Sequence, residues 1–119
     1  MTASTLPFAS CYAHGFARVA AAVPPVRLGD PSANAAATIG LARRAHDEDV
    51  ALVVFPELGL VGYSNQDLFH QEALIDAAAD ALEQVRAASG ELRPVLVVGL
   101  PLRNGHQLFN EVFNLQDAA

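Results

Sequence analysis

Glu57 is the residue of this chain whose neighbours suit it best to chemistry. It follows Pro56 at the end of a valine-rich apolar run, and two glycines come soon after it, within the segment 51-ALVVFPELGLVGYS-64. A carboxylate held among apolar side chains is partly desolvated, which raises its pKa toward neutrality and suits it to act as a general base. Charged residues also mark the ends of ordinary strands. The local sequence therefore leaves two interpretations, a catalytic base or a strand-end carboxylate that faces water.

The other reactive side chains give weaker signals. Cys11, the one thiol, lies in a polar N-terminal segment and fits no nucleophile motif, so we expect an ordinary free thiol. A single cysteine cannot form an internal disulfide, which fits a reducing cytoplasm. The four histidines stand at no metal-ligand spacing, so the sequence predicts no metal site. All seven basic residues are arginine, and a mechanism that needs a lysine cannot be completed within these 119 residues.

Charge and hydropathy exclude two classes of partner. The net charge is −6, and the largest basic cluster is the pair Arg43-Arg44. Nucleic acids and anionic membrane surfaces both require a cationic footprint, so we expect neither as a partner. No apolar run reaches the roughly 18 residues of a membrane span, and the N-terminus lacks the pattern of a signal peptide. These features favour a cytoplasmic protein.

Strand and helix patterns alternate along the chain and must position Glu57. Three short apolar runs predict strands at 16–23, 50–56 and 94–102, and the continuous run at 50–56 fits a strand buried on both faces. Helical spacing of apolar residues predicts helices at 31–49 and 67–89. The alternation indicates an α/β fold, in which function collects at the carboxyl ends of the strands. Glu57 follows such an end.

Local signals mark where these elements begin and turn. Asp30 suits the N-cap of the first helix and Pro31 its first position, whereas Asn34 in the first turn is expected to be structural. The Asn-Gly pair at 104–105 predicts a hairpin, with a return strand near 108–113. The predicted order is therefore strand–helix–strand–helix–strand with a C-terminal hairpin, in one domain that covers residues 1–119.

Several motifs in this order carry a family resemblance. The segment VVFPELGLVGYS resembles the first catalytic motif of the nitrilase-like carbon–nitrogen hydrolases. With YAHGF, GDPSAN, DLFHQ and PVLVVGLPL around it, the chain resembles the start of the glutaminase domain of bacterial glutamine-dependent NAD synthetases over roughly residues 12–110. After Asn110 the sequence is more polar than the family pattern, which predicts a departure from it. The resemblance implies a partial nitrilase-type α-β-β-α sandwich, the N-terminal portion of an incomplete domain.

The resemblance also implies an activity, that of the glutamine amidohydrolase part of a ligase. In this family a Cys nucleophile, a Glu general base and a Lys cleave the amide of glutamine, and Glu57 matches the base. Tyr63 matches a tyrosine near the glutamine pocket, where substrate contact and packing are both open. The family's Lys and Cys motifs have no counterpart here, so the chain alone is expected to be inactive.

The remaining partners are implied by the same resemblance. Ammonia would pass to a separate synthetase domain, which would use ATP and Mg²⁺ to amidate deamido-NAD, whereas the glutaminase domain itself would need no cofactor. The expected partners are glutamine, the rest of the glutaminase domain, the synthetase domain and, in the intact protein, further copies in a homo-oligomer. Two alternatives stay open: another amidohydrolase of the nitrilase superfamily, and a non-catalytic assembly module with the same fold.

Overall fold

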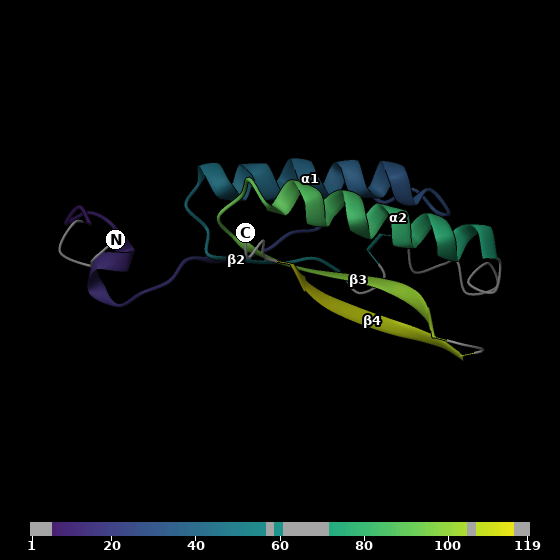
Figure 1. Cartoon of the computed structure of the whole chain (residues 1–119). Helices are drawn as coiled ribbons and strands as arrows, with labels where there is room; N and C mark the ends of the chain where they lie inside the picture. The colour runs from purple at the N-terminus through teal and green to yellow at the C-terminus, as the bar shows by residue number, and fades with distance from the viewer. Residues whose placement is uncertain (1–5, 57–58, 61–71, 105–106, 116–119) are drawn as a thin grey trace.

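The computed structural model describes residues 6–56, 59–60, 72–104 and 107–115, and the side chains within 6–56, 59–60 and 73–100. It consists of a sheet and two long helices (Figure 1). The strands are β1 (Val19–Ala21), β2 (Leu52–Val54), β3 (Val95–Asn104) and β4 (Gln107–Leu115), and the helices are α1 (Pro31–Asp47) and α2 (Glu72–Ser89). A short 3₁₀ helix, η2 (Cys11–His14), precedes β1. The predicted order of strands and helices is confirmed, although β1 and β2 are shorter than their apolar runs.

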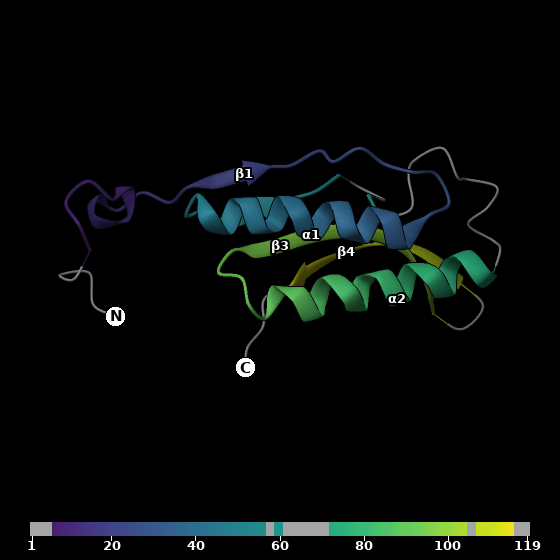
Figure 2. The same ribbon diagram turned by 90° about the horizontal axis from the view of Figure 1, so that it is seen from above.

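The sheet has the order β1-β2-β3-β4, so β2 lies between β1 and β3. Val53 of β2 pairs in parallel with Ala20 on one side and Leu96 on the other, and β3 and β4 form the predicted antiparallel hairpin. The two parallel connections step in the same direction across the sheet. Crossovers of the same hand then place both helices on one face, and Figures 1 and 2 show α1 and α2 side by side over that face.

Local chemistry explains where α1 begins. Asp30 is the N-cap, and its carboxylate accepts a hydrogen bond from the Ala33 N–H at 3.1 Å, while Pro31 occupies the first helical position. Both assignments confirm the sequence prediction. The buried face of the helix carries small residues, including Ala35 and Ala42, which are fully buried. Small side chains let the helix axis approach the sheet closely.

The two faces of the sheet differ in burial. Val53 and Phe55 point toward the helices and are 0% and 6% exposed, whereas Val54 between them is 43% exposed. On β1, Val19 is 64% exposed. The expectation that residues 50–56 are buried on both faces is therefore wrong for the described part of the chain. The physical reason is that both helices lie on the same face of the sheet.

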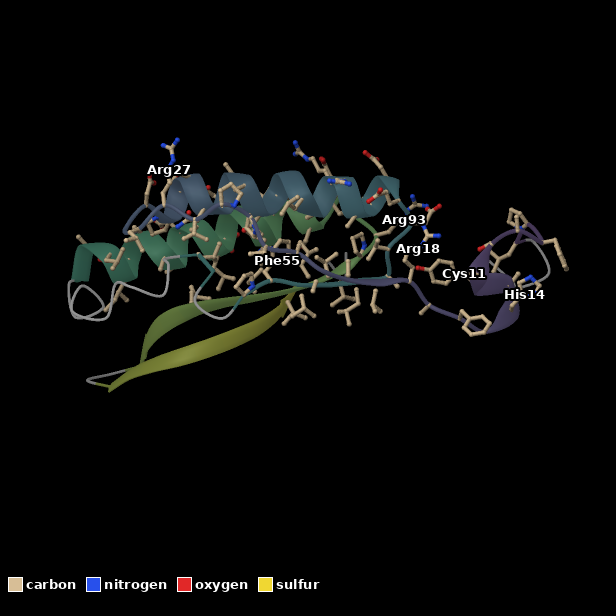
Figure 3. All side chains as sticks on the ribbon, turned by 180° about the vertical axis from the view of Figure 1, so that it is seen from behind. Cys11, His14, Arg18, Arg27, Phe55 and Arg93 are labelled. Atoms are coloured by element: carbon tan, nitrogen blue, oxygen red, sulfur yellow. The ribbon has the colours of Figure 1, made fainter. Side chains whose placement is uncertain are left out.

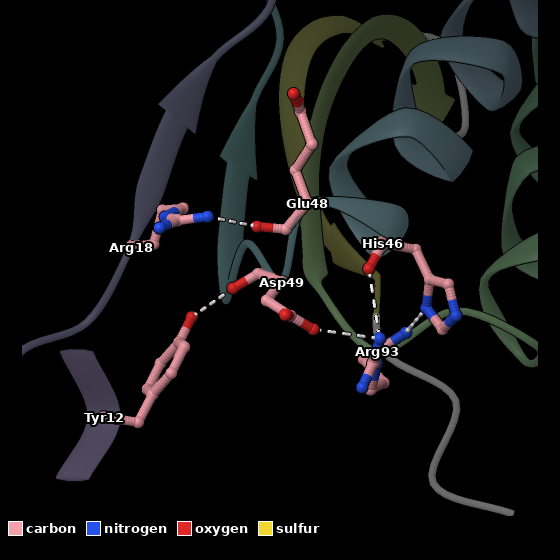
Figure 4. A network of polar contacts seen from close by, with 6 residues as sticks. All are labelled: Tyr12, Arg18, His46, Glu48, Asp49 and Arg93. Atoms are coloured by element: carbon pink, nitrogen blue, oxygen red, sulfur yellow. Dashed lines mark hydrogen bonds and ion pairs between the residues drawn. The ribbon is translucent and has the colours of Figure 1, made fainter. Parts of the chain in front are cut away.

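A network of polar contacts closes the edge of the sheet where the parallel strands begin (Figure 4). The Tyr12 hydroxyl donates to the Asp49 carbonyl at 2.6 Å, and the Arg18 guanidinium donates to the Glu48 carbonyl at 2.6 Å. Arg93 pairs with the Asp49 carboxylate at 3.1 Å. Asp49 itself has a φ of 58°, in the left-handed region, where it turns the chain from α1 toward β2. The network thus joins η2, β1 and β3 to the end of α1.

The left-handed backbone of Asp49 yields a stability prediction. Asp49→Gly and Asp49→Ala both remove the carboxylate that pairs with Arg93, but a Cβ disfavours a positive φ. We expect Asp49→Ala to have a free energy of unfolding about 1 kcal/mol lower than Asp49→Gly. Urea unfolding followed by circular dichroism measures the difference. Equal unfolding free energies would show that the backbone at this turn is not strained by a side chain.

The apolar face of the sheet that the helices leave uncovered yields a second prediction. Because Val54 and Val19 are exposed on it, the chain is expected to associate at high concentration. In Val54→Thr, association would bury the threonine hydroxyl, which costs about 1–2 kcal/mol of association free energy. The association constant should therefore fall roughly tenfold. Light scattering measures this. Ala36→Ser, which adds a hydroxyl at an exposed position of α1, is the matched control. A clean monomer at high concentration would contradict the prediction.

Candidate functional site

The carboxyl edge of the parallel sheet is where the sequence places Glu57. Beyond the end of β2, the chain stays bound to β3, because the Phe55 N–H donates to the Val97 carbonyl at 2.9 Å. Pro56 follows and is half-buried. Glu57, Leu58 and Tyr63 lie outside the described residues. The described geometry therefore concerns the backbone on either side of positions 57 and 58.

The chain is fixed again directly after these two positions. The Gly59 N–H donates to the Pro56 carbonyl at 3.0 Å, and the Leu60 N–H donates to the Gly99 carbonyl of β3 at 3.3 Å. A Cβ atom on Gly59 would lie 2.9 Å from the Pro56 carbonyl oxygen, closer than such atoms approach. Position 59 is thus restricted to glycine by this close approach. In the sequence, positions 57 and 58 therefore stand between Phe55 and Leu60, whose backbone N–H groups both donate to carbonyls of β3.

Asn34 joins this edge to the first turn of α1. Its side chain is 1% exposed, and its amide nitrogen donates to the Leu60 carbonyl at 3.0 Å and to the Arg27 carbonyl at 2.8 Å. Its amide oxygen accepts from the Arg27 N–H at 2.7 Å. The sequence predicts a structural role for Asn34 but not its contact with the segment after Glu57. The helical spacing could have indicated that Asn34 is buried, because Asn34, Thr38 and Ala42 lie four residues apart and share the buried face of α1.

Cys11 lies at the opposite edge of the sheet. It lines an open pocket of about 600 Å³ together with Arg18, Arg93 and the residues that lead into β2, Val50 and Ala51. Figure 3 shows Cys11 beside these two arginines and Phe55 further along the sheet. β2 runs from this pocket toward its own carboxyl end, so Cys11 lies near the end of the strand where the chain enters it. The expectation that Cys11 is an ordinary free thiol stays a prediction.

The described side chains give no indication of a metal site or a membrane segment. Among them, no three or more His, Cys, Asp or Glu residues gather closely enough to hold an ion. None of the helices within the described ranges has the length and apolar character needed to cross a membrane.

On α2, hydrogen bonds from Arg86 hold the pKa of Glu83 below its usual range. Both side chains are more than half exposed, so this pair is a helix-surface interaction.

Comparison with curated proteins gives closely related sequences. The chain is 52% identical over 103 residues to the glutamine-dependent NAD(+) synthetase of Mycobacterium tuberculosis. The matched region covers 87% of this chain and 15% of that protein. The chain therefore spans about one seventh of the relative's length.

Solved structures share the fold. A glutamine-dependent NAD(+) synthetase from Cytophaga hutchinsonii superposes with a TM-score of 0.77 at 22% identity, covering 84% of this chain and 17% of that one. An amidase from Nesterenkonia sp. superposes with a TM-score of 0.65 at 26% identity, covering 82% of this chain and 38% of that one. The predicted α/β fold of the nitrilase type is thus confirmed.

A family profile decides the membership. The profile described as carbon-nitrogen hydrolase matches residues 18–119, a range that includes the segment after Asn110 that we expected to depart from the pattern. That expected departure is therefore not supported. Because the match takes in the whole parallel sheet and both long helices, this chain belongs to the carbon–nitrogen hydrolase family.

Proposed function

We propose that this chain forms the N-terminal part of the glutaminase domain of a glutamine-dependent NAD synthetase. The observation that carries the proposal is the 52% identity over 103 residues to a protein of that name. The amidase from Nesterenkonia sp. supports the second candidate, another amidohydrolase of the nitrilase superfamily, but only at 26% identity. The synthetase is the better supported of the two.

In this proposal Glu57 is the general base for amide hydrolysis. It accepts the proton of a Cys thiol, and the thiolate attacks the carbonyl carbon of the glutamine amide to give a tetrahedral intermediate. A Lys stabilises the developing negative charge, the C–N bond breaks, and ammonia leaves with a proton returned by the glutamic acid. Water then attacks the resulting thioester, the C–S bond breaks, and glutamate and the free Cys thiol are released. The family resemblance alone supports the further proposal that Tyr63 contacts the glutamine. The Cys and Lys come from other parts of the intact enzyme, since these 119 residues include no lysine and Cys11 lies at the other edge of the sheet.

The described geometry supports a base at position 57. The position follows the central parallel strand at its carboxyl end, where ligands of open α/β sheets bind. The hydrogen bonds of Phe55 and Leu60 to β3 fix the backbone before and after it. General-base catalysis requires such fixed placement because proton transfer depends on hydrogen-bond reach.

Several finer parts of the proposal concern the intact protein. The glutaminase domain uses no metal or cofactor, and ATP and Mg²⁺ belong to the synthetase domain, where the ammonia amidates deamido-NAD. The intact protein is a cytoplasmic homo-oligomer. The partners of this chain are glutamine, the remainder of its domain and the synthetase domain.

The chain by itself is expected to release no ammonia from glutamine, because the nucleophile and the lysine are missing. Purified chain is incubated with glutamine, and ammonia is measured against the Glu57→Gln variant. Release above that variant would contradict the assignment of the missing groups to other residues.

The role of Glu57 is tested in a complete enzyme. The 103-residue segment of the Mycobacterium tuberculosis synthetase that matches this chain is replaced by the corresponding residues of this chain. In this chimera, Glu57→Gln should slow glutamine-dependent NAD synthesis by about 10²-fold or more, because the amide cannot accept the thiol proton. Synthesis from free ammonia should stay close to the level of the unsubstituted chimera, since that reaction does not pass through the glutaminase site.

Three outcomes separate the interpretations of Glu57. Loss of the glutamine-dependent rate alone supports the general base. A parallel loss of both rates would mean that Glu57 maintains the fold, and two unchanged rates would mean that it is a strand-end carboxylate facing water. A chimera that has ammonia-dependent but no glutamine-dependent activity before any substitution would contradict the proposed function itself.

A further inference from the structure

We propose that Asn34 is a positioning residue for glutamine hydrolysis, acting through the Leu60 carbonyl on the backbone that carries Glu57. This inference rests on the function proposed above. It begins from the burial of the Asn34 side chain, which is 1% exposed in the first turn of α1. An amide is a poor choice for a helix that packs on a sheet, because a buried polar group is costly unless all its hydrogen bonds are made.

The hydrogen bonds of Asn34 define the orientation of its amide. The Arg27 N–H lies 2.7 Å from one terminal atom of the side chain, which must therefore be the oxygen. The nitrogen then faces the carbonyls of Arg27 and Leu60, at 2.8 and 3.0 Å. Both amide hydrogens are used, and a flipped amide would place N–H groups against the Arg27 N–H. The contact with Leu60 thus depends on a donor that only the amide nitrogen supplies.

Leu60 is held from two different elements. Its N–H is bound to Gly99 of β3 at 3.3 Å, and its carbonyl is bound to Asn34 of α1 at 3.0 Å. Its side chain is buried in the core at 1% exposure. A residue whose N–H and carbonyl are both bound by elements of the rigid scaffold has little freedom to rotate about its φ and ψ angles.

The fixed residue stands three positions after Glu57. The turn that returns the chain is local, because the Gly59 N–H binds the Pro56 carbonyl at 3.0 Å. A local hydrogen bond sets the shape of a turn but not its orientation relative to the sheet. The bond from Asn34 supplies part of that orientation. Loss of the donor should therefore displace position 57 relative to the nucleophile without removing any catalytic group.

The test compares Asn34→Asp with Ser89→Ala in the chimeric synthetase. Asn34→Asp keeps the shape of the side chain and the acceptor for the Arg27 N–H, but as a carboxylate it removes the donors to both the Leu60 and the Arg27 carbonyls. We expect kcat for glutamine-dependent synthesis to fall about 10- to 100-fold, the scale of small misplacements at an active site, with KM for glutamine little changed. Ser89→Ala removes a buried hydrogen bond of similar kind, from the Ser89 hydroxyl to the Arg86 carbonyl at 2.6 Å, in α2. It should leave kcat unchanged.

A double-mutant cycle shows whether Asn34 acts through Glu57. If it does, Asn34→Asp should have little further effect in the Glu57→Gln variant, because no base remains to be positioned. Full additivity of the two losses would overturn the proposal. So would an unchanged kcat in a folded Asn34→Asp protein, or an equal loss of ammonia-dependent synthesis.

Folding and the proposed function are controlled separately. All rates are measured well below the thermal unfolding midpoint of each variant. If Asn34→Asp does not fold, Asn34→Ala removes the same donor without placing a carboxyl group in the core, and an unchanged kcat there overturns the proposal. If Glu57→Gln has no effect while Asn34→Asp does, Asn34 acts on another group, and both the role assigned to Glu57 and this proposal are overturned. A chimera without glutamine-dependent activity before substitution contradicts the proposed function.

Discussion

The parallel pairing of β2 on both of its sides is the constraint on which the rest of the structure depends. Val53 is fully buried at its centre, between Ala20 and Leu96. Parallel neighbours cannot be joined by a hairpin, so the chain must cross over the sheet twice, through α1 and α2. Both crossovers step in the same direction, which places both helices on one face. The same geometry brings the first turn of α1 to the edge of the sheet at which β2 ends.

Much of this fold could be predicted because its signals are local. Asp30 and Pro31 mark the start of α1 by chemistry that involves only the first turn of the helix. The Asn-Gly pair at 104–105 marks the hairpin in the same way. The burial of residues 50–56 was predicted less well. A continuous apolar run reports that both faces of a strand are apolar, but the coverage of each face depends on elements elsewhere.

The candidate site was harder to predict because its contacts join residues far apart in the sequence. The side chain of Asn34 contacts Leu60, which lies 26 positions further along the chain. The burial of Asn34, Thr38 and Ala42 places Asn34 on the buried face of α1, but the sequence does not show which backbone carbonyl lies opposite its side chain. Position 57 was located by the end of an apolar run, a local signal, whereas the bonds of its neighbours to β3 required the sheet register.

The two edges of the parallel sheet use different chemistry to fix the backbone. At the edge where the strands begin, Arg18 and Arg93 bind carbonyls from exposed positions, where water screens their charges and desolvation costs little. At the edge where β2 ends, the group that binds the Leu60 carbonyl is a neutral amide at 1% exposure. A charged donor buried there would need a counter-ion, and its field would act on any ionisable group nearby. A neutral donor fixes the backbone without placing an uncompensated charge in the core, which gives a physical reason for an asparagine at position 34.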